Sequence, residues 1–345
     1  MFIITNFGRL FMKKELFGRL PGGEEVFVYT LENRDASLSV MSYGAAILSF
    51  SVFGREIVGG FDSLLDYPSD SSYQGATVGR VANRISDAEF TMDGAIYMLR
   101  ANDGESCLHG GVGFSKRNFK LEEVGEESVL FSYYSPDGEE GFPAGLMTRV
   151  RYTLSGTAVI IGYEAIPEGK TPISLTNHAY FNLDGFGSTI YNHRARIYAE
   201  SYTEVGDDLI PTGERPKVRG TVFDFTSPKE IGRDIGDSFS GYDHNFILSP
   251  EIFREFSERR LGLGATVEGE ELRLNVYTDR PGLQFYTGNF LGDGPDFRGG
   301  IPQIRHGAFC LEAQSEPNSI KRGECFYDEG EKYTHFCVYE IEKKQ

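Results

Sequence analysis

The chain is built from short runs of hydrophobic residues, rich in β-branched and aromatic side chains, which end at clusters of Gly, Asp, Asn and Pro. Runs of about four to eight such residues between turn residues are typical of β-strands. Because no helical periodicity lies between the runs, the pattern predicts a sandwich or barrel and argues against alternating β-α-β units. The predicted strands are 25–31, 37–40, 46–53, 129–134, 148–154, 158–165, 194–199, 272–278, 283–287, 309–313 and 335–342.

Helical signals are few. Residues 250–260 begin at a proline and carry apolar residues at Ile252, Phe253 and Phe256, so they predict a short helix, with a charged loop as the alternative. Although 345 residues would suggest about two domains, no linker or repeat divides the chain. Residues 15–345 are therefore predicted to form one all-β domain, a large β-sandwich with few short helices. Residues 1–14 are expected to be an N-terminal extension, loosely attached over its first eleven residues.

Composition and charge narrow the class of partner. The formal charge is −17, from 34 Lys and Arg against 51 Asp and Glu, and this balance disfavours nucleic acids and anionic membranes, both of which attract basic surfaces. No run reaches the roughly 18 apolar residues of a membrane span. Cys107, Cys310, Cys325 and Cys337 form no CxxC pair, so reduced thiols in the cytoplasm are expected, and no zinc site.

Two histidines have surroundings that suit chemistry. His178 lies in the segment LTNHAYFNL, among Asn and Tyr side chains that can hold its imidazole in one orientation. His109 precedes two glycines, which permit close backbone approach and leave the ring open to a cleft. Taken alone, each could equally be a buried or turn histidine. His193, His306 and His335 have no acidic partner in sequence and are expected to be structural or at the surface.

Other polar residues occupy unusual positions. Glu312 interrupts an apolar strand, where a carboxylate is costly unless paired, and burial would raise its pKa and make it a better base. Asp243 lies in a loop of polar and aromatic residues such as sugar sites use, although an Asx turn would explain it too. Arg80, Asn83 and Arg84 lie in GRVANRI, which lacks both common phosphate-loop patterns, and either arginine could form a structural ion pair.

Together these segments resemble the aldose 1-epimerase family. The matching segments occur in the family's order and approximate spacing, from about residue 15 to the C-terminus; they are GRVANRI, LHGG, TNHAYFNL, YDHNF, PGLQFYTGN and LEAQ. The resemblance implies the galactose mutarotase-like supersandwich, a fold that agrees with the strand pattern.

The resemblance also implies roles for individual residues. Glu312 would be the general base and His178 the general acid, while the substrate would be held by Asn83, Arg84, His109, Tyr180, Asp243 and Gln284. Arg80 is left as a structural residue. The implied reaction interconverts the α and β anomers of aldohexoses such as D-galactose and D-glucose. It needs one base at the C1 hydroxyl and one acid at the ring oxygen, and it needs no cofactor and no metal. A monomer or homodimer acting on a small sugar is expected.

Three alternatives stay open at this point. A sugar-phosphate 1-epimerase would need a cluster of arginines, and Arg80 and Arg84 alone are thin support. A non-catalytic sugar-binding module could use the same sandwich, although the intact Glu312 and His178 argue against it. A glycosidase would use Asp243 and Glu312 as its two carboxylates.

Overall fold

The protein is described by a computed structural model over residues 11–256 and 258–344. Within these residues every pairing between strands is antiparallel, and three larger sheets are joined by four two-stranded pairs. The only α-helix in this part of the chain is α1 (Asp66–Ser69), a single turn. None of its helices is long and apolar enough to cross a lipid bilayer. The predicted all-β sandwich class is confirmed.

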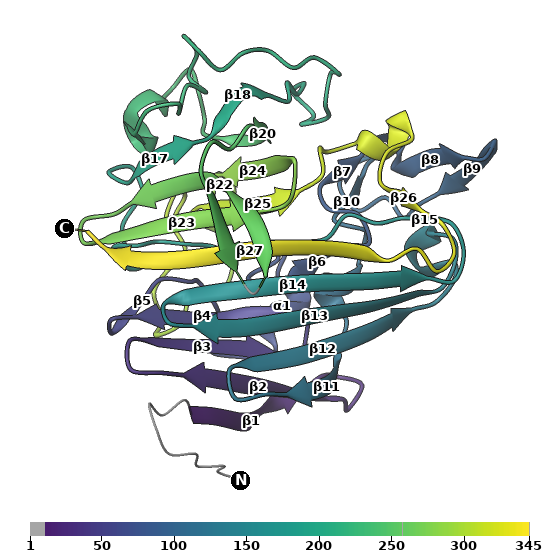
Figure 1. The fold of residues 1–345 in the computed structure, drawn as a ribbon, viewed down its shortest axis with the longest axis horizontal. Coiled ribbons are helices and arrows are strands. Elements are labelled where there is room, and N and C mark those ends of the chain that lie inside the picture. The colour runs from purple at the N-terminus through teal and green to yellow at the C-terminus, as the bar shows by residue number, and fades with distance from the viewer. Residues whose placement is uncertain (1–10, 257, 345) are drawn as a thin grey trace.

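The largest sheet has ten strands and forms the broad layer seen in Figure 1. Its order is β11 (Lys120–Val124), β12 (Ser128–Ser135), β13 (Leu146–Ser155), β14 (Ala158–Pro167), β27 (Tyr333–Lys343), β23 (Leu272–Thr278), β22 (Arg259–Glu268), β17 (Arg194–Ile197) and β19 (Lys229–Glu230), with β21 (Phe253–Phe256) paired to β22. Residues of β13 alternate between buried and half-buried, as expected for a strand with one face on the core.

The N-terminal part of the chain forms a five-stranded meander that packs near β11 and β12 (Figure 1). Its strands are β1 (Phe11–Arg19), β2 (Glu25–Glu32), β3 (Ala36–Met41), β4 (Ala46–Val52) and β5 (Arg55–Glu56). One hydrophobic cluster joins Leu38 and Phe50 of this sheet to Val150 and Ile161 of the large sheet. The core of the sandwich therefore lies between the two sheets.

A four-stranded sheet carries three of the predicted site residues, Asp243, Gln284 and Glu312. Its order is β18 (Ala199–Tyr202), β20 (Asp243–Leu248), β24 (Gly282–Tyr286) and β25 (Cys310–Gln314). Phe285 and Leu311 are directly opposite each other, and both are part of the main core. Successive residues of a strand point to opposite faces. The neighbouring pair Gln284 and Glu312 therefore faces away from that core.

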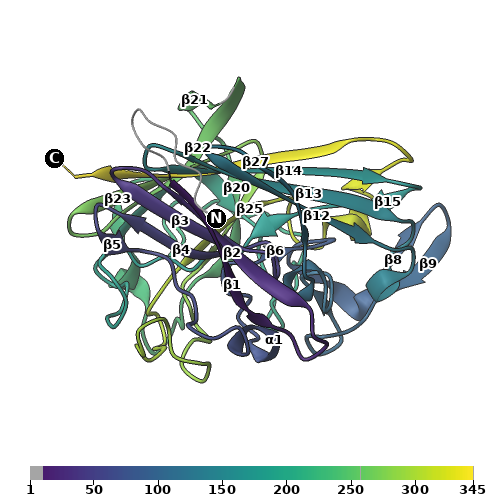
Figure 2. The same ribbon diagram turned by 90° about the horizontal axis from the view of Figure 1, so that it is seen from below.

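Short elements complete the structure, and many of them lie to one side of the large sheet (Figure 2). The two-stranded pairs are β6 (Thr77–Val78) with β16 (Thr176–Asn177), β7 (Arg84–Ile85) with β10 (Cys107–Leu108), β8 (Glu89–Met92) with β9 (Ala95–Met98), and β15 (Thr171–Pro172) with β26 (Phe326–Tyr327). The 3₁₀ turns are Ser86–Ala88, Phe114–Lys116, Glu139–Gly141, Ile231–Asp234 and Ser319–Arg322.

Three local predictions differ from the structure. The helix predicted over 250–260 is wrong, because β21 and β22 form a hairpin there and Phe256 packs on Tyr277 of β23. The predicted strand 194–199 is divided at Tyr198, so that β17 joins the large sheet and β18 the four-stranded one. Residues 11–14, expected to belong to the N-terminal extension, are part of β1, which pairs with β2. Residues 1–10 lie outside the described part of the chain.

Candidate active site

One pocket collects most of the predicted site residues. It encloses about 580 Å³ of empty space, part of which is open to solvent. Seven of the eight predicted residues line it: Asn83, Arg84, His109, His178, Tyr180, Asp243 and Glu312. The eighth, Gln284, lies beside the pocket and donates a hydrogen bond from Nε2 to Asp243 Oδ1 over 2.6 Å. Gln284 therefore holds the Asp243 carboxylate in place.

The register of the four-stranded sheet explains why distant residues meet here. Asp243 lies opposite Tyr286, which lies opposite Cys310, and Gln284 lies opposite Glu312 in the next row on the same face. The face that β20, β24 and β25 turn away from the main core is therefore polar. This face forms one wall of the pocket.

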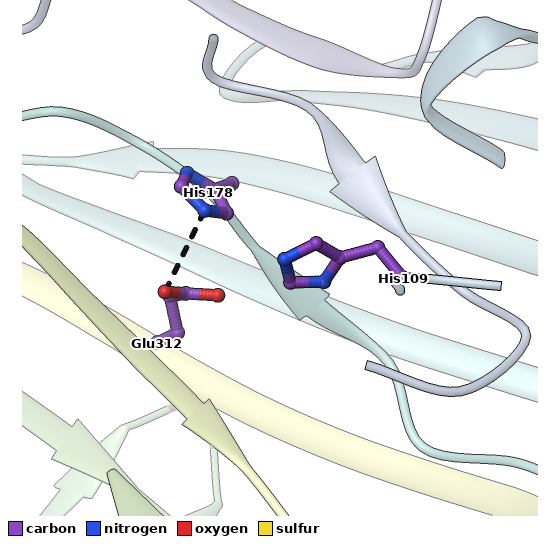
Figure 3. A group of neighbouring side chains, drawn as sticks. All are labelled: His109, His178 and Glu312. Carbon is purple, nitrogen blue, oxygen red and sulfur yellow. Dashed lines mark ion pairs between the residues drawn. The ribbon is translucent and has the colours of Figure 1, made fainter. Parts of the chain in front are cut away.

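His178 and Glu312 face each other across the pocket (Figure 3). His178 Nε2 lies 3.7 Å from Glu312 Oε1, and both side chains are almost fully buried. The other oxygen, Glu312 Oε2, has no hydrogen-bond partner among the described residues. The second ring nitrogen of His178, Nδ1, contacts Cys310 Sγ over 3.6 Å. The pair is thus a buried acid and a buried base with free bonding capacity toward the pocket.

Burial sets the charge of the pair. Desolvation raises the pKa of Glu312 well above its ordinary value, with a further contribution from the nearby Asp243 carboxylate. Desolvation also lowers the pKa of His178 to about 4. Both shifts favour the neutral forms of the two side chains in the free site. The raised pKa of Glu312 agrees with the sequence-based expectation. The imidazolium implied for His178 is not the form that burial favours in the free site.

His109 points toward this pair from the opposite side (Figure 3). The backbone N–H of Asn83 donates to His109 Nδ1 over 3.1 Å, and the backbone N–H of His109 donates to the Asn83 carbonyl over 3.1 Å. Because Nδ1 accepts, the proton of the neutral ring must be on Nε2. Burial keeps the ring neutral, since it lowers the pKa of His109 well below its usual range. His109 is therefore a hydrogen-bond donor at the far edge of its ring.

Arg84 carries the positive charge of the pocket. Its Nε donates to Asp103 over 2.7 Å, and its Nη1 lies 4.0 Å from Asp243 Oδ2. Despite this arginine, burial raises the pKa of Asp243. Arg84 connects the short β7–β10 pair to β20, so one charged group holds two parts of the pocket together.

The ligand atoms of His109, His178 and Glu312 all lie within 4.8 Å of one another, a spacing that could suit a metal ion. The bonding of His109 argues otherwise. A histidine that binds a metal usually donates its other ring N–H to an acceptor. His109 Nδ1 instead accepts from Asn83, so Nε2 keeps its proton and offers no lone pair. The donor chemistry of the cluster therefore fits hydrogen bonding better than metal binding.

Several lining residues were not predicted. Tyr73 packs edge-on against His109, with ring centroids 4.7 Å apart, and Tyr286 and Phe290 form part of the same pocket. Tyr286 lies inside the segment PGLQFYTGN, so the alternation of β24 with Gln284 could have identified it. Phe290 follows that segment directly and is 73% exposed. Tyr73 lies in a loop with no motif, and no sequence signal indicated it.

The residues expected to be structural are outside the pocket. Arg80 is buried, and its guanidinium donates to Ser135 and to the carbonyls of Pro136, Pro143 and Ala144. Every polar edge of that side chain is therefore used within the fold. The three histidines expected to be structural or at the surface, His193, His306 and His335, each bond a backbone group and do not line the pocket.

Comparisons of sequence and of structure with known proteins indicate the same family. The sequence model of the aldose 1-epimerase family matches residues 28–340. Galactose mutarotase of Sus scrofa is 40% identical over 336 residues, covering 93% of this chain and 96% of the relative, and aldose 1-epimerase of Escherichia coli K12 is 35% identical with the same coverage. The crystal structure of galactose 1-epimerase from Lactobacillus acidophilus NCFM has a TM-score of 0.86 at 26% identity, covering 98% of this chain and all of that one.

Proposed function

The chain belongs to the aldose 1-epimerase family, so its reaction is the interconversion of sugar anomers, and we propose that Glu312 and His178 carry the proton transfers on aldohexoses such as D-galactose and D-glucose. The observation that supports these roles is the buried pair facing one pocket, with Nε2 and Oε1 separated by 3.7 Å. The names of the relatives favour galactose.

The reaction begins when a base removes the proton of the C1 hydroxyl while an acid protonates the ring oxygen, which opens the ring. Glu312 takes the hydroxyl proton and His178 gives one to the ring oxygen. The aldehyde then turns about the C1–C2 bond, and the two groups reverse roles as the ring closes on the other face. Each positioned acid or base contributes on the order of 10²–10⁴ in rate.

The pair conserves its proton through the cycle. In the free site burial favours the protonated form of Glu312, whereas Glu312 must be ionised to act as the base. Hydroxyl groups of the bound sugar donate to the carboxylate and favour its ionised form, so the proton passes to His178 as the sugar binds. Since the number of protons is the same before and after turnover, the reaction requires no exchange with solvent.

The surrounding residues bind the sugar. His109 donates from Nε2, and the Asp243 carboxylate, held by Gln284, accepts from a hydroxyl. Arg84 and Asn83 supply further polar contacts at the same end of the pocket. Because the chain lacks Trp, stacking on the apolar face of the sugar falls to Tyr and Phe side chains.

The charge of the pocket favours a neutral sugar over a sugar phosphate. Arg84 is the only Lys or Arg among the lining residues, and two carboxylates already face it. The Arg80 guanidinium already donates its hydrogen bonds to groups within the fold and does not reach the pocket. Polarimetry of freshly dissolved α-D-galactose, α-D-glucose and α-D-glucose 6-phosphate tests the proposal. Faster loss of rotation is expected for the free sugars, and no acceleration of any aldose would reject it.

We also propose that the protein works in a reducing compartment, the cytoplasm. All four cysteines are free thiols, and burial raises the pKa of Cys107 to about 12, which keeps that thiol unreactive. Mass spectrometry after purification under air should find four free thiols.

We also propose that the protein is a monomer or a homodimer. Light scattering measures the molar mass in solution and decides between the two.

A further inference from the structure

Cys310 is a buried thiol beside the proposed acid, and the proposed reaction gives it no role. It lies on β25 two residues before Glu312, so the two side chains share one face of the strand. Cys310 Sγ lies 3.6 Å from Nδ1 of His178, and Glu312 Oε1 lies 3.7 Å from Nε2 of the same ring. All three side chains are almost fully buried. One strand therefore contacts both nitrogens of the His178 ring.

The other neighbours of His178 pack around its ring and leave Nδ1 to Cys310. Four aromatic rings have centroids 5.1–6.3 Å from that of His178; they belong to Tyr73, His109, Tyr180 and Tyr286. Among the described residues, Cys310 is the only side chain within hydrogen-bond distance of Nδ1. A hydrogen bond with the backbone of His178 also favours the protonated ring, and it raises the pKa of this histidine. Because a carbonyl only accepts, and because Nδ1 is the ring nitrogen closer to its own backbone, this contact makes Nδ1 a donor.

The proposed reaction also requires Nδ1 to be the donor in the contact with sulfur. As the sugar binds, the proton passes from Glu312 to Nε2, the nitrogen that faces the carboxyl group. A neutral imidazole carries one N–H, so Nε2 is free to accept only when the proton of the ring is on Nδ1. A thiol sulfur accepts a weak hydrogen bond. Burial keeps Cys310 in the thiol form, because it raises the pKa of that group well above its ordinary value.

We propose that Cys310 is a positioning residue for His178: its sulfur accepts a hydrogen bond from Nδ1–H, holds the neutral ring in that tautomer and leaves Nε2 free for the proton. This inference rests on the proposed function. Histidines that act as acid or base are often oriented by a carboxylate or a carbonyl, which stabilises the imidazolium. A neutral sulfur stabilises the imidazolium less. The ring therefore stays neutral in the free site and becomes a strong acid once the proton reaches Nε2.

Three substitutions separate the hydrogen bond from the packing of the sulfur. Cys310→Ser keeps an acceptor, whereas Cys310→Ala and Cys310→Val remove it with a smaller and a larger side chain. Both apolar variants should lower kcat about tenfold, as expected for one hydrogen bond to an imidazolium. Their KM should stay within twofold of the wild-type value, because Cys310 does not line the pocket. Cys310→Ser should lower kcat less than twofold.

Two outcomes of these assays would overturn the proposal. One is a folded apolar variant, Cys310→Ala or Cys310→Val, that keeps the wild-type kcat. The other is a folded Cys310→Ser variant that is as slow as the apolar variants, since the acceptor would then not matter.

The tautomer of His178 gives a second readout that does not depend on activity. Proton–nitrogen correlation NMR of protein labelled at its histidine rings distinguishes the two tautomers, and the signals missing from His178→Gln identify this residue. The Nδ1–H form is expected in the free wild-type protein and in Cys310→Ser, and a mixture with the Nε2–H form in Cys310→Ala. An Nε2–H ring in the wild-type protein, or an unchanged tautomer in Cys310→Ala, would overturn the proposal. If the wild-type protein accelerates no anomer exchange, the proposed function fails, and the spectra still decide whether Cys310 sets the tautomer.

Discussion

The pocket has two walls of different construction. The sheet wall, Asp243, Tyr286 and Glu312, comes from neighbouring strands whose register fixes where each side chain points. The loop wall, formed by Tyr73, Asn83, Arg84 and His109, comes from turns and from the two-residue strands β7 and β10. Asn83 and His109 both have a positive φ, 65° and 53°, which side chains other than glycine seldom adopt.

Because the two walls are built differently, substitutions on the sheet wall should change the chemistry of the site, and substitutions on the loop wall should change its geometry. On the sheet wall the backbone is regular, so a substitution should change charge or protonation and leave the shape of the site intact. On the loop wall, Asn83 and His109 hold each other through two hydrogen bonds, and the backbone conformation itself positions the donor. Substitutions there should weaken sugar binding and stability together.

The largest effect is expected at the acid and base themselves. His178→Gln removes one proton-transfer group and should lower kcat by about 10²–10⁴-fold. Because the two groups act as a unit, the double variant with Glu312→Gln should be no slower than the slower single variant. Polarimetry measures all three rates. A double variant whose loss equals the product of the single losses would show that the groups act independently.

Glu312 should also limit stability. Burial raises its folded-state pKa, so the stabilising contribution is present below the unfolded value, about pH 4.3, and is lost as pH rises toward the folded value. Glu312→Gln removes this loss and should raise the free energy of unfolding at pH 7 by about 1–3 kcal/mol. Thermal melts from pH 4 to pH 8 should show the gain growing with pH. A gain that is equal at all pH values would contradict the assignment.

Glu56 provides the matched control for that experiment. It is also a carboxylate of a sheet, but it accepts from the backbone N–H groups of Phe50 and Val58 and pairs with Arg298. Glu56→Gln should therefore lower the melting temperature and leave anomer exchange unchanged. The two substitutions are expected to shift the melting temperature in opposite directions, and only Glu312→Gln should slow anomer exchange.

Asn83 distinguishes backbone from side chain on the loop wall. Asn83→Gly and Asn83→Ala both remove the carboxamide, and each should raise KM by about 3–10-fold for one lost hydrogen bond. Only alanine is strained at a φ of 65°, so its free energy of unfolding should be about 1 kcal/mol lower than that of the glycine variant. Denaturant titration compares the two, and equal stability would mean that the positive φ is not a constraint.

The smallest effect is expected at Tyr73. Its ring packs edge-on against His109, and its hydroxyl accepts a hydrogen bond from Asn102 over 3.3 Å. Tyr73→Leu should raise KM by about 2–10-fold, since an aromatic pair contributes about 0.5–1.5 kcal/mol. Tyr73→Phe keeps the ring and should change KM by less. If the two variants are equally impaired, the hydroxyl and not the ring supports His109.

The contrast between the sheet wall and the loop wall also explains what could be predicted from the sequence. Strand alternation and apolar flanks identified Glu312 as an unusual carboxylate in a strand, and the family segments identified His178, Asn83 and Asp243. The helical pattern at 250–260 misled because residues with helical spacing form the β21–β22 hairpin here, in which Phe256 packs on Tyr277 of β23. Tertiary contacts decided the outcome, as they often do for short amphipathic segments.

Other features were beyond single-sequence reasoning. Tyr73 has no motif and reaches the pocket only because its loop folds back onto His109. Gln284 was expected to bind the sugar, yet in the structure its amide donates to Asp243, a contact that depends on pairing between β20 and β24. The neutral forms that burial favours for Glu312 and His178 cannot be inferred without knowing how deeply the two side chains are buried together.

The most direct test of the acid–base pair is a single sample of Glu312→Gln measured in two ways. Calorimetric titration with D-galactose reports binding, and exchange NMR of the anomeric protons reports interconversion. The proposed roles predict a Kd within a few-fold of the wild-type value and an exchange rate lower by about 10²–10⁴-fold. An exchange rate equal to that of the wild-type protein at saturating galactose would remove Glu312 from the mechanism.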